Sequence, residues 1–168
     1  MTDLRVEIIA GSLVLSRTDC PTRVEAVRHL ASRIGHQTAT EGVSVRMPMD
    51  QDDFVTPDLV VLAPGGDPPV DHMVRTQDVE LAVEVVPRQE KTREFGRKTD
   101  WYAAARVRAL LVVDPRYGTW ALRTDPDGFG YRRTCSGCFG DSIPLPGPST
   151  THLLDTAALP VYRRVSEA

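Results

Sequence analysis

Three short apolar runs constrain the fold of this chain more than any other feature of its sequence. They are PDLVVLA from Pro57, VELAVEVV from Val79 and ALLVV from Ala109, and each is followed by proline or by a Gly/Pro-rich turn. Nearly continuous apolar runs of this length are typical of strands buried on both faces of a sheet. Such a sheet needs other elements to cover it, so the runs predict a mixed α/β architecture.

Amphipathic and alternating segments supply the covering elements. Apolar residues at helical spacing predict one helix over residues 23–34, capped by Thr22, and another over residues 90–106. Alternation predicts a hairpin over residues 4–15 that turns at Ala10-Gly11, a short strand over 43–47, and a hairpin around Asp127-Gly128. The acidic residues between 50 and 53 are expected in a solvated loop, and a short final element is expected near 153–162.

The length and composition are those of one small globular domain. With 168 residues and 41% hydrophobic residues, the chain is expected to form a single domain over residues 1–168. It contains no apolar stretch near the ~18 residues of a membrane span, and its start lacks the basic leader of a signal peptide, so a cytoplasmic protein is expected. Its net charge of −3 argues against avid, non-specific binding of nucleic acid.

The cysteines are too few for a disulfide framework. There are three, and Cys135 with Cys138 forms a CxxC in a Gly-rich stretch. A structural zinc site would need two further ligands, which Cys20 and the scattered histidines do not obviously supply. The favoured interpretation is an unspecialised hairpin or loop, with metal or redox use as the minor alternative.

The lysines of this chain occur in one short segment. Of the twenty basic residues, only Lys91 and Lys98 are lysine, and lysine is the basic side chain whose pKa shifts more readily. Phe95, Lys98, Tyr102 and Ala105 follow the spacing of one helical face, so Lys98 should face the sheet. A surface ion pair with Glu94, four residues earlier, is the structural alternative.

Two acidic residues belong to the apolar runs. Asp58 opens one strand and Glu84 interrupts the next, and a buried carboxylate needs a cation, a donor or a proton. On adjacent strands, with Lys98 nearby, the two carboxylates could hold Mg²⁺ and support phosphodiester hydrolysis. The structural alternatives are a turn-capping Asp58 and a Glu84 that pairs with an arginine.

The spacing of these residues resembles that of a known family. PDLVV contains Asp58, VEVVP contains Glu84, and LVVDP closes the segment; the opening VEIIAGSLVLS and the late GDSIPLPG also match. Glu94, Lys98 and Tyr102 follow Glu84 by ten, fourteen and eighteen residues. This pattern resembles the Uma2 (Uma-two) family of restriction-endonuclease-like proteins, also called domain of unknown function 820, a branch of the PD-(D/E)XK nuclease superfamily.

The resemblance implies a restriction-endonuclease-like mixed β-sheet flanked by helices, with additional β-hairpins. It implies that Asp58, Glu84 and the carbonyl of Val85 bind Mg²⁺ or Mn²⁺, that Lys98 is the catalytic cation, and that the substrate is DNA. A homodimer is expected because one site per chain cuts one strand. The sequence departs from the family at Pro87, where serine is usual, and at Glu94, where aspartate is usual. The alternatives are a catalytically silent member that acts as a binding or accessory protein, and one that acts on a small molecule.

Overall fold

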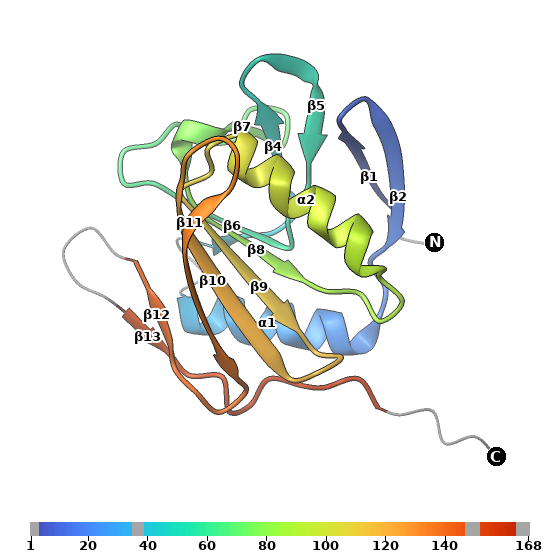
Figure 1. The fold of residues 1–168 in the computed structure, drawn as a ribbon, viewed down its shortest axis with the longest axis vertical. Helices are drawn as coiled ribbons and strands as arrows, with labels where there is room; N and C mark the ends of the chain where they lie inside the picture. The colour runs from blue at the N-terminus through green and yellow to red at the C-terminus, as the bar shows by residue number, and fades with distance from the viewer. Residues whose placement is uncertain (1–3, 35–38, 147–151, 164–168) are drawn as a thin grey trace.

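A six-stranded sheet forms the centre of the computed structural model, which describes residues 4–34, 39–146 and 152–163 (Figure 1). Its strand order is β11-β10-β9-β8-β6-β3. These strands are β3 (Ala39–Thr40), β6 (Leu59–Leu62), β8 (Val79–Val85), β9 (Ala109–Asp114), β10 (Thr119–Pro126) and β11 (Tyr131–Cys138). Among the described strands of this sheet, only β8 and β9 pair in parallel, and helix α2 (Thr92–Ala104) makes the crossover between them. The three apolar runs are therefore the three central strands, as predicted.

The two helices cover opposite faces of this sheet. Helix α1 (Pro21–Ile34) packs through Leu30 into one core cluster, which also contains Val83 and Val85 of β8. Helix α2 packs through Trp101 and Tyr102 into a second cluster with Ala82 and Val86 and with apolar residues of the second sheet. Because side chains alternate along a strand, Glu84 points toward α2, between two residues that point toward α1.

A second sheet has the strand order β2-β1-β5-β4-β7. Its strands are β1 (Leu4–Ile9), β2 (Ser12–Arg17), β4 (Ser44–Met47), β5 (Asp50–Val55) and β7 (Met73–Arg75), and a 3₁₀ turn, η1 (Thr76–Asp78), follows β7. A small antiparallel pair, β12 (Ile143–Leu145) and β13 (His152–Leu154), lies beside β10 and β11 (Figure 1). The fold is thus the mixed α/β architecture with additional hairpins that the sequence predicted.

Two local predictions were wrong. Helix α1 begins at Pro21, and the carbonyl of Cys20 accepts the Val24 N–H, so the helix starts before the proposed cap Thr22. The acidic run is not a loop but strand β5, in which Asp53 is buried and accepts hydrogen bonds from the N–H groups of Ala10 and Gly11. The final element is only the short strand β13, and the chain continues without regular structure to residue 163.

The membrane prediction can be checked on the helices. Within the described ranges, no helix is both long enough and apolar enough to cross a bilayer.

Candidate active site

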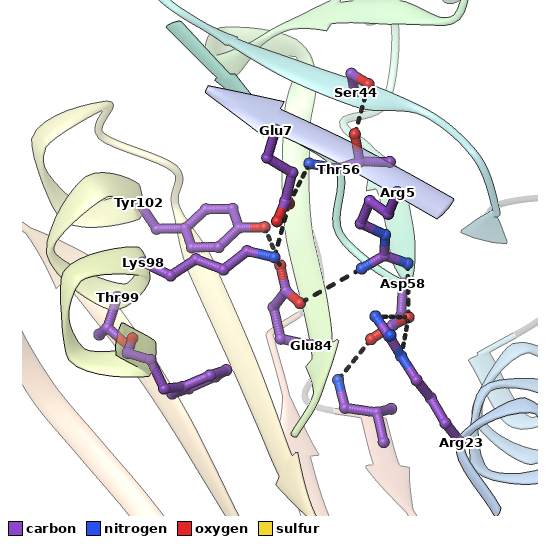
Figure 2. A network of polar contacts seen from close by, with 12 residues as sticks. Arg5, Glu7, Arg23, Ser44, Thr56, Asp58, Glu84, Lys98, Thr99 and Tyr102 are labelled. Atoms are coloured by element: carbon purple, nitrogen blue, oxygen red, sulfur yellow. Dashed lines mark hydrogen bonds and ion pairs between the residues drawn. The ribbon is translucent and has the colours of Figure 1, made fainter. Parts of the chain in front are cut away.

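Asp58, Glu84 and Lys98 come together at one end of the central sheet (Figure 2). Asp58 directly precedes β6, and its N–H donates to the carbonyl of Val83, which fixes it beside β8. The Asp58 Oδ2 atom accepts a hydrogen bond of 2.7 Å from the N–H of Val85. From α2, Lys98 places its Nζ atom 2.7 Å from Glu84 Oε1. The antiparallel pairing of β6 with β8 therefore puts the two carboxylates side by side, and the crossover helix adds the ammonium group.

Glu7 of β1 is a second partner of the same lysine. Lys98 Nζ lies 2.7 Å from Glu7 Oε1, which also accepts the backbone N–H of Thr56 at 2.8 Å. The hydroxyl of Tyr102, one helical turn beyond Lys98, donates to Glu84 Oε1 at 2.5 Å. Lys98 is therefore held between two buried carboxylates. The alternative surface pairing is wrong for this lysine, because Glu94 lies instead 4.0 Å from Lys91.

Two arginines, which the sequence did not single out, contact Asp58. Arg5 of β1 donates from Nη2 to Asp58 Oδ1 at 2.9 Å, and its Nη1 lies 3.9 Å from Glu84 Oε2. Arg23 of α1 reaches the same Asp58 Oδ1 with Nε at 2.9 Å and Nη2 at 2.8 Å. Nothing in the composition distinguishes them among eighteen arginines. One available signal was that Arg5 and Glu7 stand two residues apart on one strand and so share a face.

The charges of the buried groups shift one another's proton affinities. Burial by itself raises the pKa of Asp58, but the guanidinium groups of Arg5 and Arg23 outweigh it, so the pKa is lowered. For Glu84, burial dominates over the nearby Lys98 ammonium, and its pKa is raised. Burial would lower the pKa of Lys98, but the neighbouring carboxylates raise it above its usual value. Asp58 and Lys98 are therefore charged at neutral pH, whereas burial makes Glu84 easier to protonate than an ordinary glutamate.

A cavity of about 410 Å³ opens onto this cluster. Strand β2 and the start of α2 border it, and the polar groups at its base include Arg5, Glu7, Glu84 and Lys98. Arg97 also lines it. Arg106, two residues beyond α2, does not reach it and donates to the carbonyl of Asp127 at the turn between β10 and β11. The cavity thus gives a substrate access to Glu84 and Lys98, whereas Asp58 lines a separate cavity between β1 and the start of α1.

The donor atoms have the right chemistry for a hard divalent cation, because Asp58 and Glu84 supply carboxylate oxygens from neighbouring chain segments. The cluster as it stands, however, already contains its own cations: Arg5 and Arg23 on Asp58, and Lys98 on Glu84. Among the described residues, no group of three histidine, cysteine or acidic side chains is arranged to hold a metal. The carboxylates can therefore accept a divalent cation only if one of these side chains moves away.

The CxxC pair offers no second metal site. Cys135 and Cys138 lie on strand β11 and pair with Leu122 and Thr119 of β10. Residues three apart on a strand point to opposite faces, and both thiols are free and exposed. This arrangement agrees with the interpretation of the pair as part of an unspecialised hairpin, although the structure places it in a regular strand.

The fold and the cluster define a mixed α/β protein in which the crossover helix presents a lysine to acidic residues at neighbouring strands. Residues 1–148 match the Uma2 family, described as "Putative restriction endonuclease", and the chain belongs to this family. The predicted family is confirmed.

Solved structures support the same fold. The chain is similar to a crystal structure from Anabaena variabilis described as a "putative nuclease belonging to DUF820", with a TM-score of 0.67 and 15% identity. The similarity covers 92% of this chain and 88% of that one. No curated protein matches the chain. The predicted restriction-endonuclease-like fold is therefore confirmed.

Proposed function

We propose that this chain is an endonuclease that hydrolyses phosphodiester bonds of DNA with a divalent cation, Mg²⁺ or Mn²⁺. The observation that carries the proposal is the convergence of Asp58, Glu84 and Lys98 from three separate elements into one buried cluster, of which Glu84 and Lys98 line a cavity. Family membership supports it, since the Uma2 family is described as "Putative restriction endonuclease". The assignment of Asp58, Glu84 and Lys98 as catalytic residues is part of this proposal.

Each side chain has a distinct task in the proposed reaction. Asp58 and Glu84, with the Val85 carbonyl that the family resemblance implies, would hold the cation, which lowers the pKa of bound water and offsets charge on the phosphate. The Lys98 ammonium orients the attacking water or stabilises the negative charge that develops on phosphate oxygens. Glu7 and Tyr102 position this cluster. The Glu7 carboxylate pairs with the Lys98 ammonium, and the Tyr102 hydroxyl donates a hydrogen bond to Glu84. Arg97, exposed on the cavity wall, is placed to contact the DNA backbone.

The test is a cleavage assay on supercoiled and single-stranded DNA with Mg²⁺, with Mn²⁺ and with chelator. We expect metal-dependent cutting that is abolished in Asp58→Ala and Lys98→Met. Lys91→Met is the matched control, because that lysine is exposed and lies outside the cluster, and it should cut like the wild type. A well-folded wild type that cuts neither substrate, or Asp58→Ala protein that cuts normally, would contradict the proposal.

A binding or accessory role is the second candidate. It is favoured by the balance of buried charges, since the side chains that would hold the cation are already paired. A protein that binds DNA or a protein partner without cutting it would keep this pairing permanently. Action on a small molecule in the same cavity and assembly as a homodimer also remain proposals. The molar mass of the purified chain, measured by light scattering, would show whether it forms a homodimer.

A further inference from the structure

We infer that the Arg5 guanidinium is an internal cation of the Asp58–Glu84 pair, and that Arg5 and a divalent metal ion occupy this pair alternately. The inference rests on the metal-binding part of the proposed function and adds a residue outside the acid–lysine pattern. It makes Arg5 the side chain that limits metal affinity. Release of Arg5 would be the step that opens the site.

The position of Arg5 is the first argument. Its two terminal nitrogens face the two carboxylates: Nη2 lies 2.9 Å from Asp58 Oδ1 and Nη1 lies 3.9 Å from Glu84 Oε2 (Figure 2). A cation that bridged the same two carboxylates would have to share this space. The guanidinium therefore stands where the proposed function needs the metal ion.

Charge balance is the second argument. With Arg5 in place, the three carboxylates of Glu7, Asp58 and Glu84 face three cations, which are Arg5, Arg23 and Lys98. A divalent ion added to this set would leave two buried positive charges in excess, which a low-dielectric site disfavours strongly. Without Arg5 the same set carries one net negative charge and attracts a cation. Arg5 is thus the difference between a closed and an open cation site.

The contacts of Arg5 show that it can leave more easily than Arg23 or Lys98. Its Nη1 atom is buried and has no hydrogen-bond partner, and 3.9 Å to Glu84 is beyond hydrogen-bonding distance. Asp58 would keep Arg23 and the Val85 N–H after Arg5 had moved, so that carboxylate would not be left unpaired. By contrast, Lys98 is the only short ion-pair partner of Glu84 among the described residues.

A second cavity provides a place for the displaced side chain. It has a volume of about 600 Å³, lies between β1 and the start of α1, and is lined by Arg5 itself. Glu41, which is exposed, also lines this cavity and offers a carboxylate there. Arg5 thus borders both the cavity of the candidate site and a second, open cavity, and a rotation of its side chain exchanges one for the other.

The experiment measures Mn²⁺ binding directly, without DNA, by the loss of the free-ion electron paramagnetic resonance signal. Arg5→Met removes the charge and keeps a similar length, and we expect its affinity for Mn²⁺ to rise at least about tenfold over wild type. The gain should disappear in Arg5→Met/Glu84→Gln. Arg17→Met is the matched control, because Arg17 lies on the same hairpin but pairs with Asp19 in solvent, and its affinity should equal that of the wild type.

The outcomes separate this inference from the nuclease proposal. Equal Mn²⁺ affinity in Arg5→Met and wild type, or a gain that survives loss of the Glu84 charge, would overturn the inference even if the wild type cuts DNA. A strong gain in a protein that cuts no DNA would support it and would refute the nuclease alone. If Arg5→Met did not fold, the Nε–H resonance of Arg5 in wild type would decide: it should shift as Mg²⁺ saturates the protein, and an unchanged resonance would overturn the inference.

Discussion

Replacing Lys98 with methionine should destabilise this protein far more than replacing an ordinary lysine. The Lys98 side chain is 12% exposed and lies 2.7 Å from both Glu7 and Glu84, whose side chains are each 3% exposed. Methionine would fill similar space but leave two carboxylates without their shared cation. Breaking a buried ion pair from one side costs about 3–5 kcal/mol. Because Thr56 and Tyr102 still donate to the same carboxylate oxygens, we expect the lower end, about 3 kcal/mol.

This destabilisation should depend on pH with a definite sign. Burial already raises the pKa of Glu84, and loss of the Lys98 ammonium removes the strongest opposing influence, so the pKa rises further. An acid whose pKa is higher in the folded than in the unfolded state makes stability fall as pH rises between the two values. The deficit of Lys98→Met relative to wild type should therefore be larger at pH 8 than at pH 5.5, because acidification favours the neutral form of Glu84.

Urea unfolding followed by tryptophan fluorescence measures the effect, because Trp101 and Trp120 are both buried. Lys91→Met is the control. The Lys91 side chain is 80% exposed and its Nζ atom is 4.0 Å from Glu94 Oε1, which makes a weak surface pair. The free energy of unfolding of this variant should therefore match that of wild type. If the two variants unfolded alike at both pH values, Lys98 would not act as the buried counter-charge described here.

Three further predictions use the same cluster. Tyr102→Phe removes the hydroxyl that donates to Glu84 but keeps the buried ring against Trp101; the free energy of unfolding should fall by about 1–2 kcal/mol, and an unchanged midpoint in a urea titration would contradict this. Because burial raises the pKa of Glu84, metal-dependent cleavage should decline on acidification at a pH above the usual glutamate range of about 4.3. No loss from deprotonation of Lys98 is expected below about pH 10, since its carboxylate neighbours outweigh burial and raise its pKa; an inflection near pH 8 that Lys98→Arg abolished would refute that assignment.

Periodicity predicted the central strands and the inward position of Lys98 because both depend on local spacing. A run such as ALLVV has few options other than a buried strand, and β9 is indeed buried along nearly its whole length. The helical spacing of Phe95, Lys98 and Tyr102 put the lysine on the face that meets the sheet. The pairing of β6 with β8, which joins Asp58 to Glu84, required only that the successive apolar runs lie side by side, although the short strand β7 between them belongs to the second sheet.

The strand β5 shows where local reasoning failed. A sequence with three aspartates in four residues has low strand propensity, and exposed acidic runs are usually loops. In the fold, the partners β1 and β4 supply the pairing, and the two N–H groups at the β1–β2 turn satisfy the buried Asp53. Tertiary contacts override propensity here, and those with β1 and its turn join segments too far apart in sequence for any short window to detect.

The hairpin β1–β2 explains why the arginines of the site were missed. Alternation along β1 was recognised, but alternation alone does not tell which face is buried. The apolar residues Leu4 and Val6 face solvent, at 55% and 44% exposure, whereas Arg5 and Glu7 face the interior. Apolar residues normally occupy the inner face, so this inversion is unfavourable unless the buried charges are all paired. The partners that pair them come from α2, from β8 and from the residues before β6.

The buried charges of β1 also determine whether the acid–acid–lysine site of this fold can bind a metal ion. An acid–acid–lysine pattern carries one net negative charge, which is the condition for attracting a cation. Glu7 makes the cluster more negative by one, and Arg5 and Arg23 then add two positive charges, so the complete set is neutral. The sequence spacing identifies the first three groups. It does not identify Glu7, Arg5 and Arg23. Whether the site binds metal therefore depends on the free energy of moving one paired guanidinium, which is a property of β1 and its neighbours and not of the catalytic pattern itself.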